Sequence, residues 1–209
     1  MAVVREGTRA GTCSAPVNLD GEAAHEAGRR FDLTPIQQSY ILGRFHTEPP
    51  QPCQVYVEFD VRGFDLPRLW CAIEAAVDRH PMLRVDCDGE QQFYNDAFSF
   101  SITYARGVDL SRRRAECMDA FERQRDFWNV SVSDLGGDVA RVHVLFDMLC
   151  VDATSMFTLA SEVATEYSGI AVAPAPLRTF RSFCECRKHP TPAALRYWMP
   201  RLDTLPGPP

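Results

Sequence analysis

The chain has 209 residues, of which 45% are hydrophobic and 24% are charged, as in ordinary globular domains. This length suffices for one substantial hydrophobic core. A net charge of −6 gives no overall attraction to phosphate backbones, so nucleic acid is not expected as a partner. There is neither an apolar run that could cross a bilayer nor a secretory leader, so we expect a cytoplasmic protein without a membrane partner.

The cysteines form no CxxC pair and have no histidines at zinc-ligand spacing, so no metal site is expected. Most of them fall within apolar periodic segments, which predicts small, buried, reduced side chains. Their positions are Cys13, Cys53, Cys71, Cys87, Cys117, Cys150, Cys184 and Cys186.

Residues 1–30 lack periodicity and are expected to form a linker or arm before a folded unit at 31–209. A helix is predicted from Pro35 to about Phe45, because Thr34 can cap it and Gln37 completes the spacing of a capping box. Ile36, Tyr40 and Ile41 of this helix are expected in the core.

Strands and helices then alternate irregularly, which favours a layered α/β or α+β domain. The last predicted helix is disturbed by Pro200. In chain order we predict a strand at 53–61, a helix after Asp65, a hairpin around Asp88 and Gly89, a strand at 98–105, a helix at 109–125, a hairpin at 128–146 that turns at Gly136 and Gly137, a helix ending at Gly169, a proline-rich crossing at 171–180, and a helix at 191–205.

Three consecutive arginines, Arg112 to Arg114, lie in the helix predicted at 109–125. Such a run is typical of a solvated helix face, and we interpret it so.

The most informative segment is DMLCVDATS, residues 147–155. It places Asp147, Asp152 and Ser155 at a corner where an apolar strand gives way to a helix. Polar groups at the end of a strand are well placed to act on a ligand.

At this point four segments together resemble the heterocyclisation domains of nonribosomal peptide synthetases, which are relatives of condensation domains. In order they are FDLTPIQQSYILGR, DRHPMLR, FDMLCVDATS and YWMPRLDTLPGPP, and they cover the N-terminal half of such a domain. The pattern Asp, four residues, Asp, two residues, Ser is met in full by Asp147, Asp152 and Ser155. Asp32 departs from the family, which usually has proline there, but the capping signal at Thr34 survives.

The resemblance implies a chloramphenicol-acetyltransferase-like lobe, normally followed by a second lobe across a tunnel. Carrier proteins would present acyl groups on phosphopantetheine, and no cofactor would be bound directly. The family joins an acyl thioester to a carrier-bound Cys, Ser or Thr, then cyclises and dehydrates the product to a thiazoline or oxazoline. Residues that the family uses for cyclodehydration belong to the C-terminal lobe, so a single lobe is expected to be inactive alone.

The resemblance also suggests roles for individual residues. Condensation domains carry two histidines where this chain has Asp147 and Met148, and methionine cannot transfer a proton. We predict a buried ion pair between Asp152 and Arg84, as in relatives, with a mainly architectural role. Tyr40, Gly43, Arg44 and Met148 are assigned to the tunnel wall or to lobe packing.

Asp147 could face the tunnel and accept a proton from the incoming amine, or it could be structural and bind backbone amides at the helix start. Ser155 is expected to cap the helix or support the aspartates, because no base stands near it in sequence.

His143 and Asp147 also have the HxxxD spacing of histidine-dependent acyltransferases. In that family the motif lies in the loop after the strand, whereas His143 lies within the strand, so we interpret His143 as structural. A self-sufficient acyltransferase would need His143 in the site. The other alternative is a non-catalytic half-domain that binds or docks carrier proteins.

Overall fold

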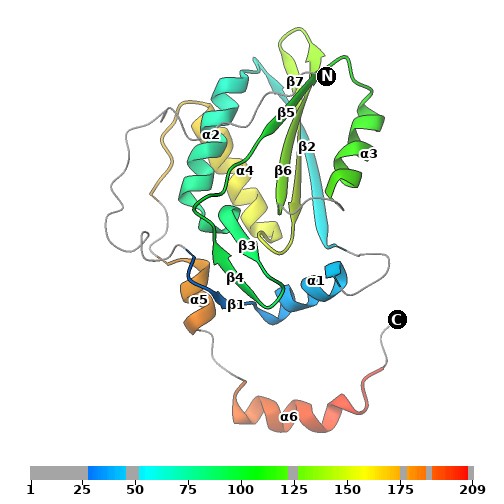
Figure 1. Ribbon diagram of the computed structural model, residues 1–209, viewed down its shortest axis with the longest axis vertical. Helices are drawn as coiled ribbons and strands as arrows, with labels where there is room; N and C mark the ends of the chain where they lie inside the picture. Colours follow the sequence, from blue (N-terminus) through cyan, green and yellow to red (C-terminus); the bar gives the residue numbers. More distant parts are fainter. Residues whose placement is uncertain (1–27, 46–51, 122–126, 175–177, 187–189, 207–209) are drawn as a thin grey trace.

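The computed structural model describes residues 28–45, 52–121, 127–174, 178–186 and 190–206 (Figure 1). A four-stranded sheet in the order β2-β7-β6-β5 forms its centre. Its strands are β2 (Gln54–Arg62), β5 (Ile102–Arg106), β6 (Trp128–Gly136) and β7 (Val139–Asp147). The strand pairs are antiparallel except for β5 and β6, which are parallel. The α/β class expected from the sequence is confirmed.

The sequence alternation places different chemistry on the two faces of this sheet. Ala140 and Val142 of β7 point into the apolar core, together with Val130 and Val132 of β6. The intervening residues of β7, among them His143 and Asp147, point to the opposite face, because successive side chains of a strand alternate.

Helices α2 (Leu66–Arg79) and α4 (Ala153–Tyr167) lie side by side on the apolar face of the sheet (Figure 1). Asp65 caps α2 by accepting a hydrogen bond from the Arg68 amide at 2.9 Å. Helix α3 (Leu110–Phe121) lies against the opposite, polar face. The apolar core therefore lies between the sheet and the α2–α4 pair.

A small sheet in the order β1-β4-β3 lies below the main one, with its strands β1 (Phe31–Asp32), β3 (Val85–Cys87) and β4 (Gln91–Tyr94). The 3-10 helix η2 (Pro81–Arg84) leads into β3. Helix α1 (Pro35–Phe45) follows β1, and α5 (Phe180–Cys186) packs beside β1 (Figure 1). The predicted hairpin around Asp88 and Gly89 is confirmed as β3–β4.

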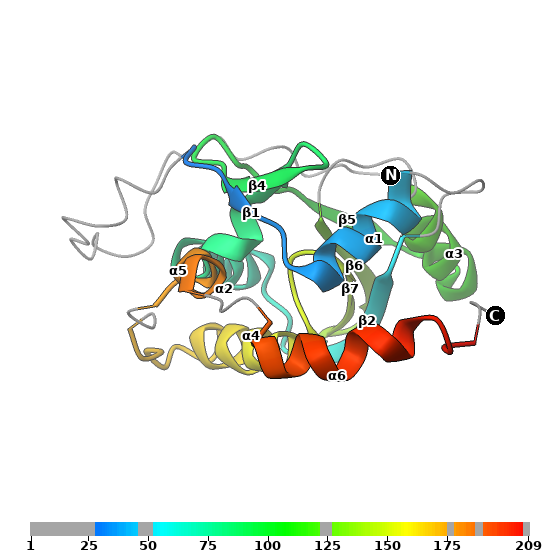
Figure 2. The ribbon, with the colours of Figure 1, turned by 90° about the horizontal axis from the view of Figure 1, so that it is seen from below.

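Helix α6 (Pro192–Leu202) stands away from the body in Figure 1, and in Figure 2, which is seen from below, it lies in front of α4 and β2. It contains Pro200 within its length and has no buried residue. In the part of the chain that the structure describes, no helix has the length and apolarity needed to span a bilayer.

Most predicted elements are present, with shifted ends. The capping box of α1 is confirmed: the Gln37 amide donates to Thr34 Oγ1 at 3.3 Å, and the Thr34 amide donates to Gln37 Oε1 at 3.0 Å. The strand predicted from residue 98 begins at Ile102, and the short elements β1 and α5 were not predicted. Residues 1–27 of the predicted arm lie outside the described residues.

Several predictions about burial are wrong. Ile36 is 58% exposed, whereas Ile41 is buried and Tyr40 is half-buried against the core. Among the described cysteines, Cys150 is buried but Cys53 and Cys186 are exposed. Arg113 is buried although it belongs to the run of arginines predicted to be solvated.

Candidate functional site

The segment predicted to carry chemistry forms the corner between β7 and α4. Backbone hydrogen bonds fix it from two neighbouring strands: the Asp147 amide donates to the Phe127 carbonyl at 2.8 Å, and the Met148 amide donates to the Cys53 carbonyl at 2.9 Å. The Cys150 amide closes the turn on the Asp147 carbonyl at 3.1 Å. The corner is therefore held rigidly at the end of the strand.

Asp147 is the buried acid of this corner, with only 2% of its surface exposed. Its Oδ1 accepts a hydrogen bond from the Leu149 amide at 2.8 Å, and its Oδ2 forms an ion pair with Arg44 of α1. Burial raises the pKa of the Asp147 carboxyl, and this outweighs the opposing effects of the Leu149 amide and the Arg44 guanidinium. The carboxylate is thus a stronger base than an exposed aspartate.

Helix α1 reaches the corner at two places, which are two helical turns apart on one face. Near its start, Gln37 Nε2 donates to the Leu149 carbonyl at 2.8 Å. Near its end, Arg44 binds Asp147 and lies over the Phe127 ring, 5.3 Å from the ring centre. Residues at i and i+7 share a helix face, so one face of α1 binds both the backbone and the acid of the corner.

The side chains of Gln37 and Gln92 extend this attachment into the small sheet. Each amide donates to the other's oxygen at 3.0 Å, and both side chains are buried. A buried amide must be hydrogen-bonded to avoid a desolvation cost, and these two satisfy one another.

The surroundings of Asp147 bring together other predicted residues. Tyr40 lies near both Asp147 and Cys53, and burial, followed by these two neighbours, raises its pKa. Gly43 precedes Arg44 on the last turn of α1. Met148 is half-buried next to the acid. Tyr40, Gly43, Arg44 and Met148 are therefore all close to Asp147 in the chain or in space.

Asp152 and Ser155 have a different place from Asp147. Asp152 is the N-cap of α4, and its Oδ1 accepts a hydrogen bond from the Ser155 amide at 2.7 Å. This amide and the Ser155 hydroxyl lower the pKa of the Asp152 carboxyl. The carboxyl is exposed, so Asp152 is a solvated helix cap rather than a second buried acid.

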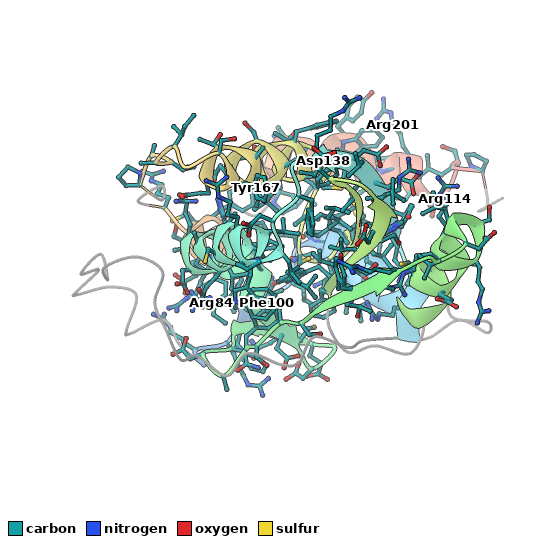
Figure 3. All side chains as sticks on the ribbon, turned by 90° about the horizontal axis from the view of Figure 1, so that it is seen from above. Arg84, Phe100, Arg114, Asp138, Tyr167 and Arg201 are labelled. Atoms are coloured by element: carbon teal, nitrogen blue, oxygen red, sulfur yellow. The ribbon has the colours of Figure 1, made fainter. Side chains whose placement is uncertain are left out.

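The predicted ion pair between Asp152 and Arg84 is wrong. Arg84 ends η2, and its guanidinium is 3.8 Å from the carboxylate of Asp96, while Asp152 binds the helix amide. Arg84 directly precedes β3 of the small sheet, and it is labelled in Figure 3. The physical reason is that the first turn of α4 already supplies a donor to Asp152, so the carboxylate needs no distant cation.

His143 lies within the sheet, away from the corner, and is 1% exposed. Its Nδ1 is 2.6 Å from the Tyr56 hydroxyl and its Nε2 is 2.9 Å from Ser133 Oγ. Both ring nitrogens are bonded to neighbouring strands, in agreement with the structural interpretation of this histidine.

Three contributors to the site were not recognised in the sequence. Gln37 was predicted only as part of a capping box, yet it also binds the corner. Phe127 supplies both a backbone acceptor and a ring. Gln54 lies opposite Asp147 in the β2–β7 register, and its Nε2 is buried without a hydrogen-bond partner among the described residues. In that same part of the chain, no group of three His, Cys, Asp or Glu side chains could hold a metal ion.

The chain is similar in sequence to parts of larger proteins of known function. No protein-family model matches the chain. It is 32% identical over 204 residues to pyochelin synthetase PchF of Pseudomonas aeruginosa, covering 88% of this chain and 11% of that protein. It is 30% identical over 222 residues to phenyloxazoline synthase MbtB of a Mycobacterium species, covering 97% of this chain and 19% of that protein.

Among solved structures, the chain is similar to the EpoB nonribosomal peptide synthetase cyclization-docking bidomain from Sorangium cellulosum. The TM-score is 0.70 at 25% identity, over 90% of this chain and 42% of that one. The fold is therefore that of a condensation domain, and the chloramphenicol-acetyltransferase-like class is confirmed. The chain belongs to the condensation and heterocyclisation domains of nonribosomal peptide synthetases, and it spans less than a fifth of the curated relatives named above.

Proposed function

We propose that the chain is the N-terminal lobe of a heterocyclisation domain, with Asp147 as its acid–base group. The observation that carries the proposal is a buried aspartate with a raised pKa at the position where condensation domains have histidine. The domain would act in the cytoplasm on substrates tethered to carrier proteins. A C-terminal lobe would supply the other wall of the tunnel.

The chemistry requires one amide bond, one ring closure and the loss of one water. The amine of a carrier-bound Cys, Ser or Thr attacks the upstream acyl thioester and releases the carrier thiol. The side-chain thiol or hydroxyl then attacks the new amide carbonyl, and elimination of water gives a thiazoline or oxazoline. Attack needs the amine to lose a proton, and a carboxylate with a raised pKa accepts one more readily than an ordinary aspartate. The Met148 side chain, next to Asp147, cannot accept a proton from the amine.

Arg44 would be a positioning residue for this base. Its guanidinium fixes one carboxylate oxygen while the Leu149 amide fixes the other, so the orientation of the acid is set on both sides. Arg44 also favours the ionised form, so its removal should raise the pKa of Asp147 further. The acid limb of the pH–rate profile should then move to higher pH, and Arg44→Lys should restore part of the wild-type profile.

The test combines this chain with a separately produced C-terminal lobe of a heterocyclisation domain and two loaded carrier proteins. Mass spectrometry of the tethered product follows amide formation and the loss of one water. We expect turnover with the wild-type chain and a loss of about a hundredfold or more with Asp147→Asn. Asp138→Asn, in the exposed turn before β7, is the matched control and should leave the rate unchanged. No turnover from a folded, associated pair of lobes would overturn the proposal.

A second candidate is a non-catalytic half-domain that binds carrier proteins. One observation favours it: both aspartates of the motif already have protein partners, Arg44 and the Leu149 amide for Asp147 and the Ser155 amide for Asp152. This candidate predicts that carrier binding survives Asp147→Asn and that no partner lobe yields product. A folded Asp147→Asn variant that retains the wild-type rate of condensation would exclude Asp147 as the base.

A further inference from the structure

A second polar cluster lies on the same face of the sheet as Asp147 but under α3 instead of α1. We call it the Glu58 cluster, and it consists of Tyr56 and Glu58 of β2, Ser133 of β6, Arg141 and His143 of β7, and Arg114 of α3. Neither the proposed reaction nor the apolar core uses it. Figure 3 shows Arg114 on α3, far from Arg84 and the small sheet.

Glu58 joins α3 to the sheet. Its carboxylate accepts hydrogen bonds from Arg114 Nε at 2.8 Å and from Arg114 Nη2, and Arg141 Nη1 approaches it at 3.3 Å. These partners lower the pKa of Glu58 to about 2, with the Arg114 hydrogen bond as the largest cause. None of the described α3 side chains belongs to the apolar core cluster, so polar contacts carry much of the attachment of α3.

The hydrogen-bond distances define one consistent direction through the cluster. Tyr56 Oη is 3.0 Å from Glu58 Oε2, and an ionised carboxylate can only accept, so Tyr56 donates to it. The Tyr56 oxygen must then accept from His143 Nδ1–H at 2.6 Å, while Ser133 Oγ lies 2.9 Å from Nε2. Because burial favours the uncharged ring, His143 is neutral in this arrangement, with its proton on Nδ1 and with Nε2 accepting from the Ser133 hydroxyl.

The charges around the ring are mainly positive. The positive charges are Arg141 on β7 and Arg113 and Arg114 on α3, and the negative charges are Glu58 and Asp60 on β2. The uncharged side chains around the His143 ring are Tyr56, Cys117, Ser131 and Ser133. Arg113 is buried, and its Nε and Nη2 have no hydrogen-bond partner among the described residues. A fourth positive charge here would be opposed by three guanidinium groups and assisted by Asp60 and by Glu58, whose carboxylate is 3.6 Å from Nδ1.

We propose that His143 makes the attachment of α3 sensitive to acid: α3 stays on the sheet while the ring is neutral, and protonation of the ring releases it. A protonated ring must donate from Nε2, so the Ser133 hydroxyl loses its acceptor. The new charge also faces Arg113 and Arg114, both of which leave with α3. Opening of α3 therefore removes two of the three repelling charges and hydrates the ring.

The sign of the pH effect follows from burial. Burial is the largest cause that lowers the pKa of His143 below its ordinary value of 6.5. Below about pH 6.5, His143 therefore binds more protons when α3 is open than when α3 is closed. The closed form is fully favoured only above this pH. The attachment of α3 therefore weakens as the pH falls below 6.5, the ordinary pKa of histidine.

Hydrogen exchange of the α3 amides in the full chain tests this, with rates corrected for the intrinsic effect of pH. Between about pH 7.5 and about pH 5.5, the opening of α3 should increase by up to about tenfold in the wild-type protein. In His143→Gln, whose side chain does not titrate, the increase should be less than about twofold. His80→Gln is the matched control, because His80 binds Glu162 at 2.7 Å near α4 and away from α3. It should retain the wild-type increase.

An increase of the same size in His143→Gln would overturn the proposal, as would an equal increase in α4. If His143→Gln does not fold, nitrogen-15 spectra of His143 in the wild-type protein still test the proposal, because they show which ring nitrogen carries the proton. We expect the Nδ1–H form of His143 near neutral pH, and the Nε2–H form would contradict the hydrogen-bond direction on which the proposal rests.

Discussion

Arg44 and Asp147 are 103 residues apart in the sequence and form a buried ion pair, with side chains 11% and 3% exposed. The pair joins α1 to the end of β7, so the acid of the motif is oriented by the first helix of the fold.

Removal of Arg44 should strongly destabilise the protein. Arg44→Met leaves Asp147 buried without its cation, and we expect the free energy of unfolding to fall by about 3–5 kcal/mol. Denaturant unfolding followed by circular dichroism measures this. Arg112→Met is the matched control, because the exposed Arg112 side chain pairs, among the described residues, only with Glu116 on its own helix, and its loss should cost less than about 0.5 kcal/mol. Equal losses in the two variants would contradict the role of the buried pair.

Gln37 should contribute more to stability than an ordinary helix residue. Gln37→Leu leaves the Leu149 carbonyl, the Thr34 amide and the Gln92 side chain without their partner. We expect a loss of about 2–4 kcal/mol in unfolding free energy, since each unsatisfied buried group is costly. The adjacent Gln38 is exposed, so Gln38→Leu should change the stability by less than about 0.5 kcal/mol. A Gln37→Leu variant as stable as Gln38→Leu would refute the attachment.

Asp152 should behave as a helix cap that is independent of Arg84. Asp152→Ala should cost about 1 kcal/mol, and Asp152→Asn, which also caps well, should cost much less. A double-mutant cycle with Arg84→Ala should give a coupling energy near zero, because the two side chains bind different partners. A coupling of several kcal/mol would restore the ion pair predicted from the sequence.

Glu58 should stabilise the protein at neutral pH and lose this effect in acid. Its pKa falls from an ordinary 4.5 to about 2 in the folded protein. A lowered pKa stabilises the folded state above the ordinary value, and the effect disappears as the pH falls toward the folded value. Glu58→Gln should therefore be less stable than the wild type near neutrality. Between about pH 6.5 and about pH 3, that deficit should shrink by about half. A deficit independent of pH would contradict the prediction.

Much of the fold could be predicted from local sequence. The capping box at Thr34 and Gln37, the Gly136–Gly137 turn and the apolar stripe of α4 each depend on residues close together in the chain, so pattern and propensity suffice for them. Elements that depend on distant partners were missed: β1 is two residues long and exists because it pairs with β4.

Burial on the helices could be predicted less well. Arg112, Arg113 and Arg114 are adjacent in a run that is typical of solvent, yet only Arg112 is exposed in the way expected. Arg114 forms an ion pair with Glu58 of β2, and Arg113 is buried between α3 and the strands. Ile36 shows the reverse, because the buried face of α1 is the one that carries Gln37 and Ile41.

The sequence by itself determined the family, the order of most elements and the corner from Asp147 to Ser155. Only the tertiary structure decided how the acids divide their roles. Asp152 accepts a hydrogen bond from the nearby Ser155 amide in the first turn of its own helix. Asp147 is carried into the interior at the end of β7, where desolvation demands a cation, and the fold brings Arg44 from α1 to meet it. Which arginine pairs with which aspartate depends on the packing of distant elements, and spacing along the chain does not encode it.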